Sequence, residues 1–189
     1  MAVLDCGLLL PQGRAVGAIA ASDYDDSRWR EVTLPHDWEH GFAGFSGTLA
    51  YRLSFDAPAE SGTLLALYVQ RACTNVEVFL NGELIGSGGR MQEPVTRNCY
   101  HPQLFPLPRA ALKPAGNDLQ LHVVGHAAEQ VAARQRAGGL SEVHVGLMMQ
   151  LQPAYERQLF WNVTMAQIIA ATIALLGASM LGLASMRRQ

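Results

Sequence analysis

An imidazole and a carboxylate stand side by side at His36 and Asp37, between Pro35 and Trp38. A histidine next to an aspartate supports general acid–base chemistry when both groups face a substrate. A proline before such a pair and a tryptophan after it are also typical of a structural turn that pins an N-terminal segment to a domain. We favour the structural turn, and we predict no catalytic residue in this chain.

The six histidines of the chain do not show the spacing of a metal site. His122 and His126 are four residues apart, but they run from a strand-like stretch into a loop. That spacing places two side chains on one face only in a helix. We therefore predict neither a bound metal nor a cofactor.

Polar and aromatic side chains in two expected loops are candidates for a ligand site. Sugar sites combine an aromatic surface with planar polar groups, and both kinds of side chain occur here. One loop lies between two expected strands and the other is rich in proline. If the loops meet at one rim they form a cleft; otherwise these are ordinary polar loop residues. The candidate ligand-binding residues are Arg71, Thr74, Asn75, Arg97, Asn98, Tyr100 and His101.

The three cysteines, Cys6, Cys73 and Cys99, show no C-x-x-C or zinc-site spacing. If the domain is exported, Cys73 and Cys99 can form a disulfide, because both lie near the ends of expected strands. The alternative is that both are buried or reduced thiols.

Stretches of alternating apolar and polar residues indicate a mainly β domain. Residues 49–55 and 118–124 alternate, whereas residues 64–70 are almost wholly apolar and are typical of a strand buried on both faces. Asn81-Gly82 follows one short apolar run and precedes another, which predicts a hairpin because both turn residues require a positive φ. A last alternating strand is expected at residues 141–145.

Two further segments separate these strands. Residues 94–114 contain five prolines and are expected to form a long ordered loop with one short turn. Residues 127–137 are either a short helix or a mobile loop. Five or more short strands with frequent turns predict a β-sandwich or jelly roll.

Residues 163–186 carry no charged side chain and are expected to form one transmembrane helix. At about 1.5 Å per residue they cross a hydrocarbon core of about 30 Å with some tilt. Tyr155, Phe160 and Trp161 precede this stretch and suit the membrane interface. Arg187 and Arg188 follow it, and the positive-inside rule places them in the cytoplasm and the β-domain outside.

Small residues recur every fourth position along the expected transmembrane helix. Such a stripe lets two helix backbones approach closely in lipid, although alanine is also common in membrane helices generally. We favour a packing face, used either for a homodimer or against further transmembrane helices of a longer protein. The stripe consists of Ala166, Ala170, Ala174, Ala178 and Gly182.

The composition limits the function classes and the domain count. A net charge of −2 and 16% charged residues among 189 do not favour binding to nucleic acid.

The N-terminal stretch lacks the positive start and unbroken apolar core of a signal peptide, which indicates a truncated or misplaced start. We divide the chain into a poorly defined N-terminal segment (1–21), a jelly-roll domain (22–152), a juxtamembrane segment (153–162), the transmembrane helix (163–186) and a cytoplasmic stub (187–189).

Several motifs resemble the N-terminal sugar-binding domain of family 2 glycoside hydrolases. They are W-R-E-V-T-L-P-H-D-W at 29–38, Y-R-L-S-F at 51–55, N-V-E-V-F-L-N-G at 75–82 and G-N-D-L-Q-L at 116–121. The resemblance covers roughly residues 28–125 and implies a galactose-binding-like jelly roll. In that family the two catalytic carboxylates lie on a separate barrel, and 189 residues leave no room for one.

A second resemblance extends to the apolar stretch. Residues 138–146 and 151–157, which run on into Phe160-Trp161, resemble the outer sensory region of bacterial sensor histidine kinases. In those proteins a jelly-roll input domain precedes several transmembrane helices and a kinase. The present sequence has no phospho-acceptor histidine motif and no ATP-binding lobe, so it resembles an N-terminal fragment.

Together these observations predict the periplasmic ligand-sensing domain and first transmembrane helix of a sensor histidine kinase in the bacterial inner membrane. The expected partners are membrane lipid and a small-molecule or carbohydrate ligand. The alternative is a membrane-anchored carbohydrate-binding module or a non-catalytic remnant of a family 2 glycoside hydrolase.

Overall fold

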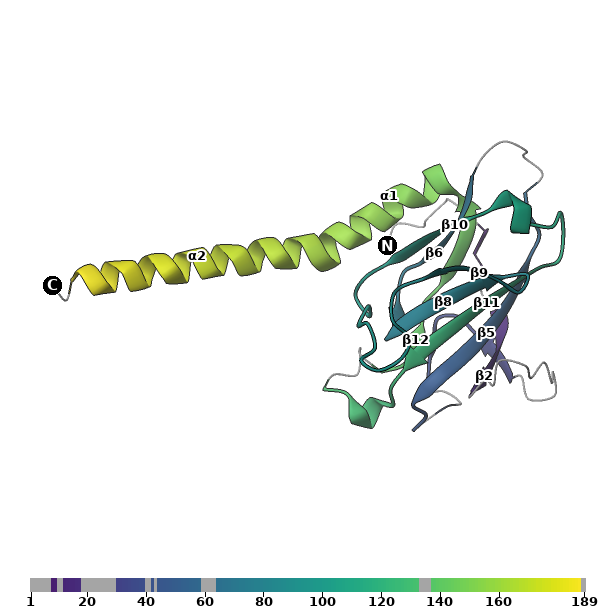
Figure 1. Ribbon diagram of the computed structural model, residues 1–189, viewed down its shortest axis with the longest axis horizontal. Coiled ribbons are helices and arrows are strands. Elements are labelled where there is room, and N and C mark those ends of the chain that lie inside the picture. Colours follow the sequence, from purple (N-terminus) through teal and green to yellow (C-terminus); the bar gives the residue numbers. More distant parts are fainter. Residues whose placement is uncertain are drawn as a thin grey trace.

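The computed structural model describes residues 8–9, 12–17, 30–39, 42, 44–58, 64–132 and 137–187. Most of the predicted N-terminal segment 1–21, Trp29 of the first family motif, and Arg188 in the predicted cytoplasmic stub lie outside these residues. The described part is a β-sandwich followed by one long helix that extends away from it (Figure 1). The prediction of a mainly β fold with a C-terminal apolar helix is confirmed.

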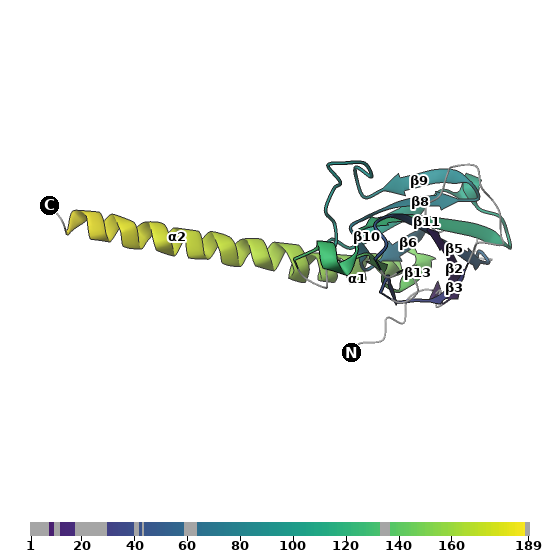
Figure 2. The same cartoon turned by 90° about the horizontal axis from the view of Figure 1, so that it is seen from below.

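The larger sheet of the sandwich has six antiparallel strands in the order β3-β2-β5-β11-β8-β9. The smaller main sheet has the order β1-β13-β6-β10, and a short third sheet has the order β4-β12-β7. Figure 2 shows β8, β9 and β11 in one layer and β6, β10 and β13 in the other. The strands are β1 (Leu8–Leu9), β2 (Gln12–Gly17), β3 (Arg30–Thr33), β4 (His36–Asp37), β5 (Gly47–Phe55), β6 (Leu65–Val69), β7 (Ala72–Cys73), β8 (Asn75–Leu80), β9 (Glu83–Ser87), β10 (Gln103–Leu107), β11 (Asn117–Gly125), β12 (Gly139–Leu140) and β13 (Val143–Leu147).

The alternating strands bury the side chains that their pattern predicts. Leu119, Leu121 and Val123 of β11 face the core, and the intervening Gln120 and His122 are half-buried on the outer face. The turn between β8 and β9 has φ values of 52° at Asn81 and 90° at Gly82, so the predicted hairpin is confirmed. We call the end of the sandwich that contains this turn the hairpin end.

The expectation of a continuous loop over residues 94–114 is wrong at 103–107, where the chain forms β10. This strand lies at the edge of its sheet and pairs only with β6 among the described strands. Pro106 lacks an N–H donor, and an edge strand tolerates proline because one side of its backbone has no partner. Two 3₁₀ turns, η2 (Arg109–Ala111) and η3 (Ala128–Gln130), are the short helical elements after β10 and β11.

The C-terminal helix is continuous from Met148 to Met186. It comprises α1 (Met148–Leu159), a π-helical turn η5 (Phe160–Thr164) and α2 (Met165–Met186). The α1 segment packs on β6, β10 and β13, and it buries Leu151 against Ala66 and Tyr68. Strand β6 is therefore covered on one face by the sandwich core and on the other by α1, which explains its wholly apolar sequence.

A buried polar group joins the His36-Asp37-Trp38 turn to the larger sheet. The Tyr51 hydroxyl accepts the Trp38 indole N–H at 3.0 Å and lies 2.9 Å from His36 Nδ1. Burial raises the pKa of Tyr51 far above its usual range, so the hydroxyl keeps its proton. Asp37 accepts a hydrogen bond from the Arg71 guanidinium at 2.9 Å. These contacts build the turn into the fold, in agreement with the structural interpretation.

The Tyr51→Phe variant is expected to unfold more easily than the wild type. It leaves the buried Trp38 N–H without its acceptor, which costs about 1–3 kcal/mol of unfolding free energy. Denaturant titration of the chain in detergent micelles, followed by tryptophan fluorescence, measures this loss. The matched control is Tyr155→Phe, because the described contacts of half-buried Tyr155 include no hydrogen bond from its hydroxyl. Equal stability of the two variants would contradict the role of the Tyr51 hydroxyl.

Candidate ligand pocket

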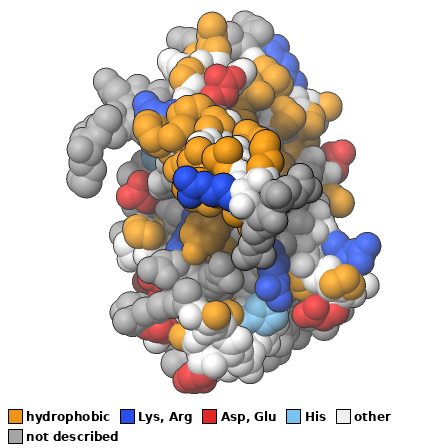
Figure 3. All heavy atoms as spheres, turned by 90° about the vertical axis from the view of Figure 1, so that its left-hand side faces the viewer, with side chains coloured by type: hydrophobic (Ala, Val, Ile, Leu, Met, Phe, Trp, Pro, Cys, Tyr) orange, Lys and Arg blue, Asp and Glu red, His pale blue; other side chains and the backbone are white. Residues whose placement is uncertain are grey.

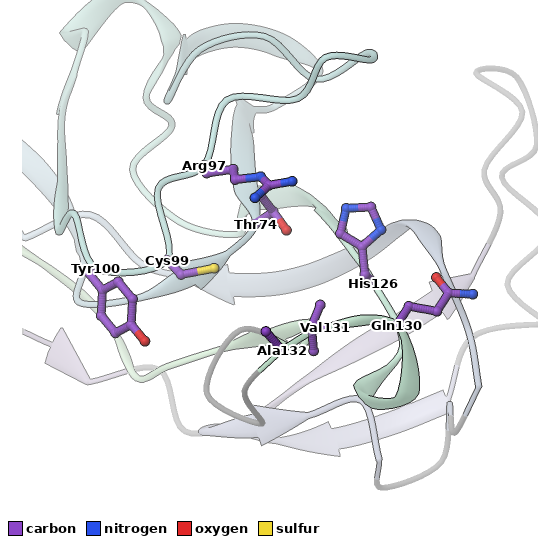
Figure 4. A pocket seen from close by; sticks show the side chains of 8 residues that line it. All are labelled: Thr74, Arg97, Cys99, Tyr100, His126, Gln130, Val131 and Ala132. Carbon is purple, nitrogen blue, oxygen red and sulfur yellow. The ribbon is translucent and has the colours of Figure 1, made fainter.

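A pocket of about 450 Å³ lies at the end of the sandwich opposite the hairpin end (Figure 4). Its size falls within the range of small-molecule sites, about 300–1,000 Å³. Three segments that are distant in sequence form its walls. The lining residues are Thr74, Arg97, Cys99, Tyr100, His126, Gln130, Val131 and Ala132.

The first wall is held by covalent and backbone links. Thr74 is buried between β7 and β8, and its carbonyl accepts the N–H of Asn98 at 2.8 Å. A disulfide joins Cys73 to Cys99, so the loop that carries Arg97 is tied to the start of β8. These links fix the positions of Thr74, Arg97 and Cys99 relative to one another.

The second wall follows β11 and is held by Ser46. The Ser46 hydroxyl accepts the N–H of Ala127 at 2.9 Å and donates to Gln130 Oε1 at 2.7 Å. The carbonyl of His126 accepts the N–H of Gly138 at 2.9 Å. The η3 turn and the residues before it are thereby tied to the residues that directly precede β5 and β12.

Close packing around Trp38 fixes the same region. A Cβ atom on Gly138 would overlap the Trp38 ring, and a Cβ atom on Gly125 would come within 2.9 Å of that ring. Only glycine fits at these two positions without moving the tryptophan. The end of β11 and the residue before β12 therefore lie against Trp38, in the segment between β3 and β5.

The described lining combines polar and apolar side chains, with one arginine and no carboxylate. Figure 4 shows Arg97, Thr74 and His126 around one part of the cavity and the Tyr100 ring at its other side. A guanidinium, a hydroxyl, an imidazole and an amide suit hydrogen bonds to hydroxyl and anionic groups. The described lining contains no carboxylate pair for glycoside hydrolysis.

Burial shifts the pKa of three described groups elsewhere in the domain. Burial lowers the pKa of His122 and of His144, although Glu142 opposes the shift at His144. Burial raises the pKa of Tyr68 to about 12, and the charge of Arg157 acts against that rise. Among the described side chains, no group of three or more metal-ligating residues is placed to hold a metal ion.

The structure brings three of the seven predicted ligand-binding residues into the pocket lining: Thr74, Arg97 and Tyr100. The two loops thus meet at one rim. The remaining four, Arg71, Asn75, Asn98 and His101, do not line it.

Local contacts explain where those four residues lie. Arg71 pairs with Asp37. Asn98 donates to buried Asn75 at 2.9 Å, so these two amides hold the loop rather than face the cavity. His101 is in the same loop as Arg97 and Tyr100, but its side chain is exposed and does not line the pocket.

Sequence reasoning missed the second wall, which His126, Gln130, Val131 and Ala132 form. Residues 127–137 show no clear periodicity, so the sequence predicts only a short helix or a mobile loop there. Its position beside Thr74 depends on the pairing of β11 with β8, which is a long-range contact. A histidine directly after an alternating strand was the one available signal.

No protein-family model matches the sequence, and no curated protein matches it. Solved structures do match. A calcium-binding mutant of Bacteroides uniformis β-glucuronidase 2 is 21% identical with a TM-score of 0.55, over 74% of this chain and 17% of that one. A glycosyl hydrolase family 2 member from Bacteroides cellulosilyticus is 20% identical with a TM-score of 0.53, over 73% and 21%. A Ruminococcus gnavus β-glucuronidase in complex with D-glucuronic acid is 12% identical with a TM-score of 0.54, over 76% and 30%.

These likenesses show a shared fold: the chain contains a β-sandwich of the kind found in family 2 glycosidases. The predicted resemblance in fold to that family is confirmed. The chain spans less than a third of the length of each of these three enzymes.

Removal of the Cys73–Cys99 bridge is expected to destabilise the pocket end. A Cys99→Ala variant should lose about 2–4 kcal/mol of unfolding free energy, because the unfolded chain is no longer cross-linked. Denaturant titration with and without reducing agent measures the difference. Cys6→Ala is the control, since it removes a thiol and keeps the bridge. If reduction leaves the wild-type chain as stable as before, the bridge does not stabilise this end.

Proposed function

We propose that this chain is the extracytoplasmic ligand-sensing region of a membrane receptor, and specifically the input region of a sensor histidine kinase. One observation carries the proposal: the wall of the pocket touches the helix that leaves the domain. The Asn162 side-chain amide donates to the carbonyl of Tyr100 at 2.9 Å, and Tyr100 lines the pocket. A ligand that moves this loop therefore acts directly on the helix.

The helix from Met148 to Met186 is long and apolar enough to cross a membrane, with a mean hydropathy of 2.0 in its most apolar window. None of that window is buried against the described β-domain. In the proposed topology α2 crosses the inner membrane, Arg187 and Arg188 are cytoplasmic, and the β-domain is periplasmic. The kinase would be encoded beyond Gln189.

The contact at Asn162 lies in the π-helical turn, where the regular hydrogen-bond ladder changes between α1 and α2. Turns of this kind occur at functional positions in helices. Ligand binding would favour one of two arrangements of α2 by stabilising one position of the pocket loop, which is a population shift.

We propose a carbohydrate with an acidic group as the ligand. Arg97 supplies a cation, and the hydroxyl and amide groups around it suit a polyol. The structural neighbours named as glucuronidases, including one in complex with D-glucuronic acid, support the choice of a sugar acid as the first probe.

The likeness in fold to family 2 glycosidases favours a second candidate, a membrane-anchored carbohydrate-binding module or a non-catalytic remnant of such an enzyme. The genomic sequence after Gln189 separates the two. Further transmembrane segments and a histidine-kinase core support the receptor. A stop codon, with no kinase in another reading frame, overturns it.

Arg97→Ala is expected to weaken binding of D-glucuronic acid by about tenfold, because a charge-assisted hydrogen bond is lost. Titration calorimetry of the full chain in detergent micelles measures the affinity. Arg109→Ala, an exposed arginine near the hairpin end, is the matched control and should bind as the wild type does. Equal affinities of both variants, or no binding of any sugar on a glycan array, would contradict a sugar site in this pocket.

Ala174→Ile is expected to lower self-association of the chain, because the larger side chain keeps two helix backbones apart. It interrupts the small-residue stripe, which consists of Ala166, Ala170, Ala174, Ala178 and Gly182. Chemical cross-linking in lipid vesicles at several protein-to-lipid ratios measures dimer formation. Leu176→Ile is the control, since position 176 lies about 200° around the helix from position 174. Loss of dimer in both variants, or in neither, would contradict the stripe as a packing face.

A further inference from the structure

The helix leaves the sandwich at the end that carries the pocket. Leu147 at the end of β13 pairs with Leu65, and Leu65 pairs with Leu107 of β10. The chain then passes from Leu107 into η2, where the carbonyl of Ala111 accepts the Asn81 side-chain amide at 2.7 Å. Helix α1 therefore begins at the hairpin end and runs back across β6 toward the opposite end.

The pocket loop lies at the level where the apolar stretch begins. Asn162, which contacts the carbonyl of Tyr100, is the residue before the stretch 163–186. Residues 162–165 are half-buried, Asn162 through its contact with Tyr100, and residues 166–187 are exposed. In a membrane, about 1.5 Å of rise per residue leaves Tyr100 within a few ångströms of the hydrocarbon boundary.

Exposed aromatic side chains mark the same level. Tyr100 is 46% exposed, Phe160 is 43% exposed and Trp161 is 62% exposed. Tyrosine and tryptophan favour the headgroup region of a bilayer, so these residues suit a domain that rests on the lipid surface. Figure 3 looks along the helix from its C-terminal side and shows basic, acidic and histidine side chains together on the domain face around it.

The charge of the pocket points to an anion. Arg97 is exposed, no carboxylate lies in the described lining, and no described side chain forms an ion pair with its guanidinium. The shared chemistry of a fitting ligand is an anionic group with neighbouring hydroxyls. A soluble sugar acid has this chemistry, and so does the glycerol-phosphate headgroup of phosphatidylglycerol.

The geometry points to the membrane as the source: the pocket binds the anionic, hydroxyl-bearing headgroup of a lipid in the leaflet that faces the β-domain. This inference rests on the proposed ligand-sensing function of the same pocket and replaces a soluble ligand with one presented by the bilayer. A receptor of this design reports the composition of the membrane surface around its own helix. Arg97 and Tyr100 are the contacts with the headgroup layer.

The first experiment measures the depth of the pocket loop in the full chain. The Tyr100→Trp substitution is made in a Trp161→Phe background. Quenching of tryptophan fluorescence by brominated lipid is then compared between this double variant and Trp161→Phe alone. The added tryptophan should be quenched about as strongly as the natural Trp161. An Ala115→Trp variant, whose tryptophan would lie near the hairpin end, should not be quenched. An unquenched tryptophan at position 100 overturns the membrane-facing orientation.

The second experiment tests the headgroup. The chain is placed in nanodiscs of equal parts phosphatidylcholine and phosphatidylglycerol, and the lipids retained after extraction are counted by native mass spectrometry. Phosphatidylglycerol should be enriched about tenfold in the wild type, retained in Arg109→Gln and lost in Arg97→Gln. The same enrichment in all three chains indicates general surface charge and overturns the pocket as the headgroup site.

The failure of this inference can be told from the failure of the proposed function. If the nanodiscs show no enrichment but free D-glucuronic acid binds in an Arg97-dependent way, the ligand is soluble and only the lipid source is overturned. If neither the lipid headgroup nor any soluble sugar depends on Arg97, both proposals are overturned.

Discussion

The burial of β6 on both faces is the constraint on which the rest of the structure depends. Its five residues are all buried, although the core between the two sheets can cover only one face of a strand. The α1 helix supplies the second cover through Leu151, which packs with Ala66 and Tyr68 of that strand. Because α1 must lie along β6 to do this, the direction in which the chain leaves the domain is fixed. The apolar helix then emerges at the pocket end rather than at the hairpin end.

The pocket depends on links between segments that are far apart in the chain. The disulfide and the Asn98–Thr74 backbone bond hold one wall, and Ser46 holds the other through Ala127 and Gln130. None of these links uses an exposed ion pair, which would add little stability. The bond from Asn162 to Tyr100 links the pocket loop to the helix that leaves the sandwich. The site and the helix therefore share a structural element.

The likeness to family 2 glycosidases and the presence of the helix point to different uses of one fold. In the three solved neighbours the sandwich is a minor part of a larger enzyme. Here the sandwich continues without a break into an exposed apolar helix. Fold alone does not decide function, so the proposed role follows from the site and its attachment to the helix. The lack of a carboxylate in the described lining agrees with recognition of an anion.

The sequence by itself determined the strands that alternate, the Asn81-Gly82 turn and the apolar helix, because these depend on local periodicity and backbone preference. It also identified Thr74, Arg97 and Tyr100 as candidates. It did not reveal β10, since Pro106 suits a strand only when that strand is known to lie at an edge. Only the tertiary structure decided that residues 126–132 close the pocket and that the helix leaves beside Tyr100. Both follow from long-range pairing and packing, and no short window of sequence contains that information.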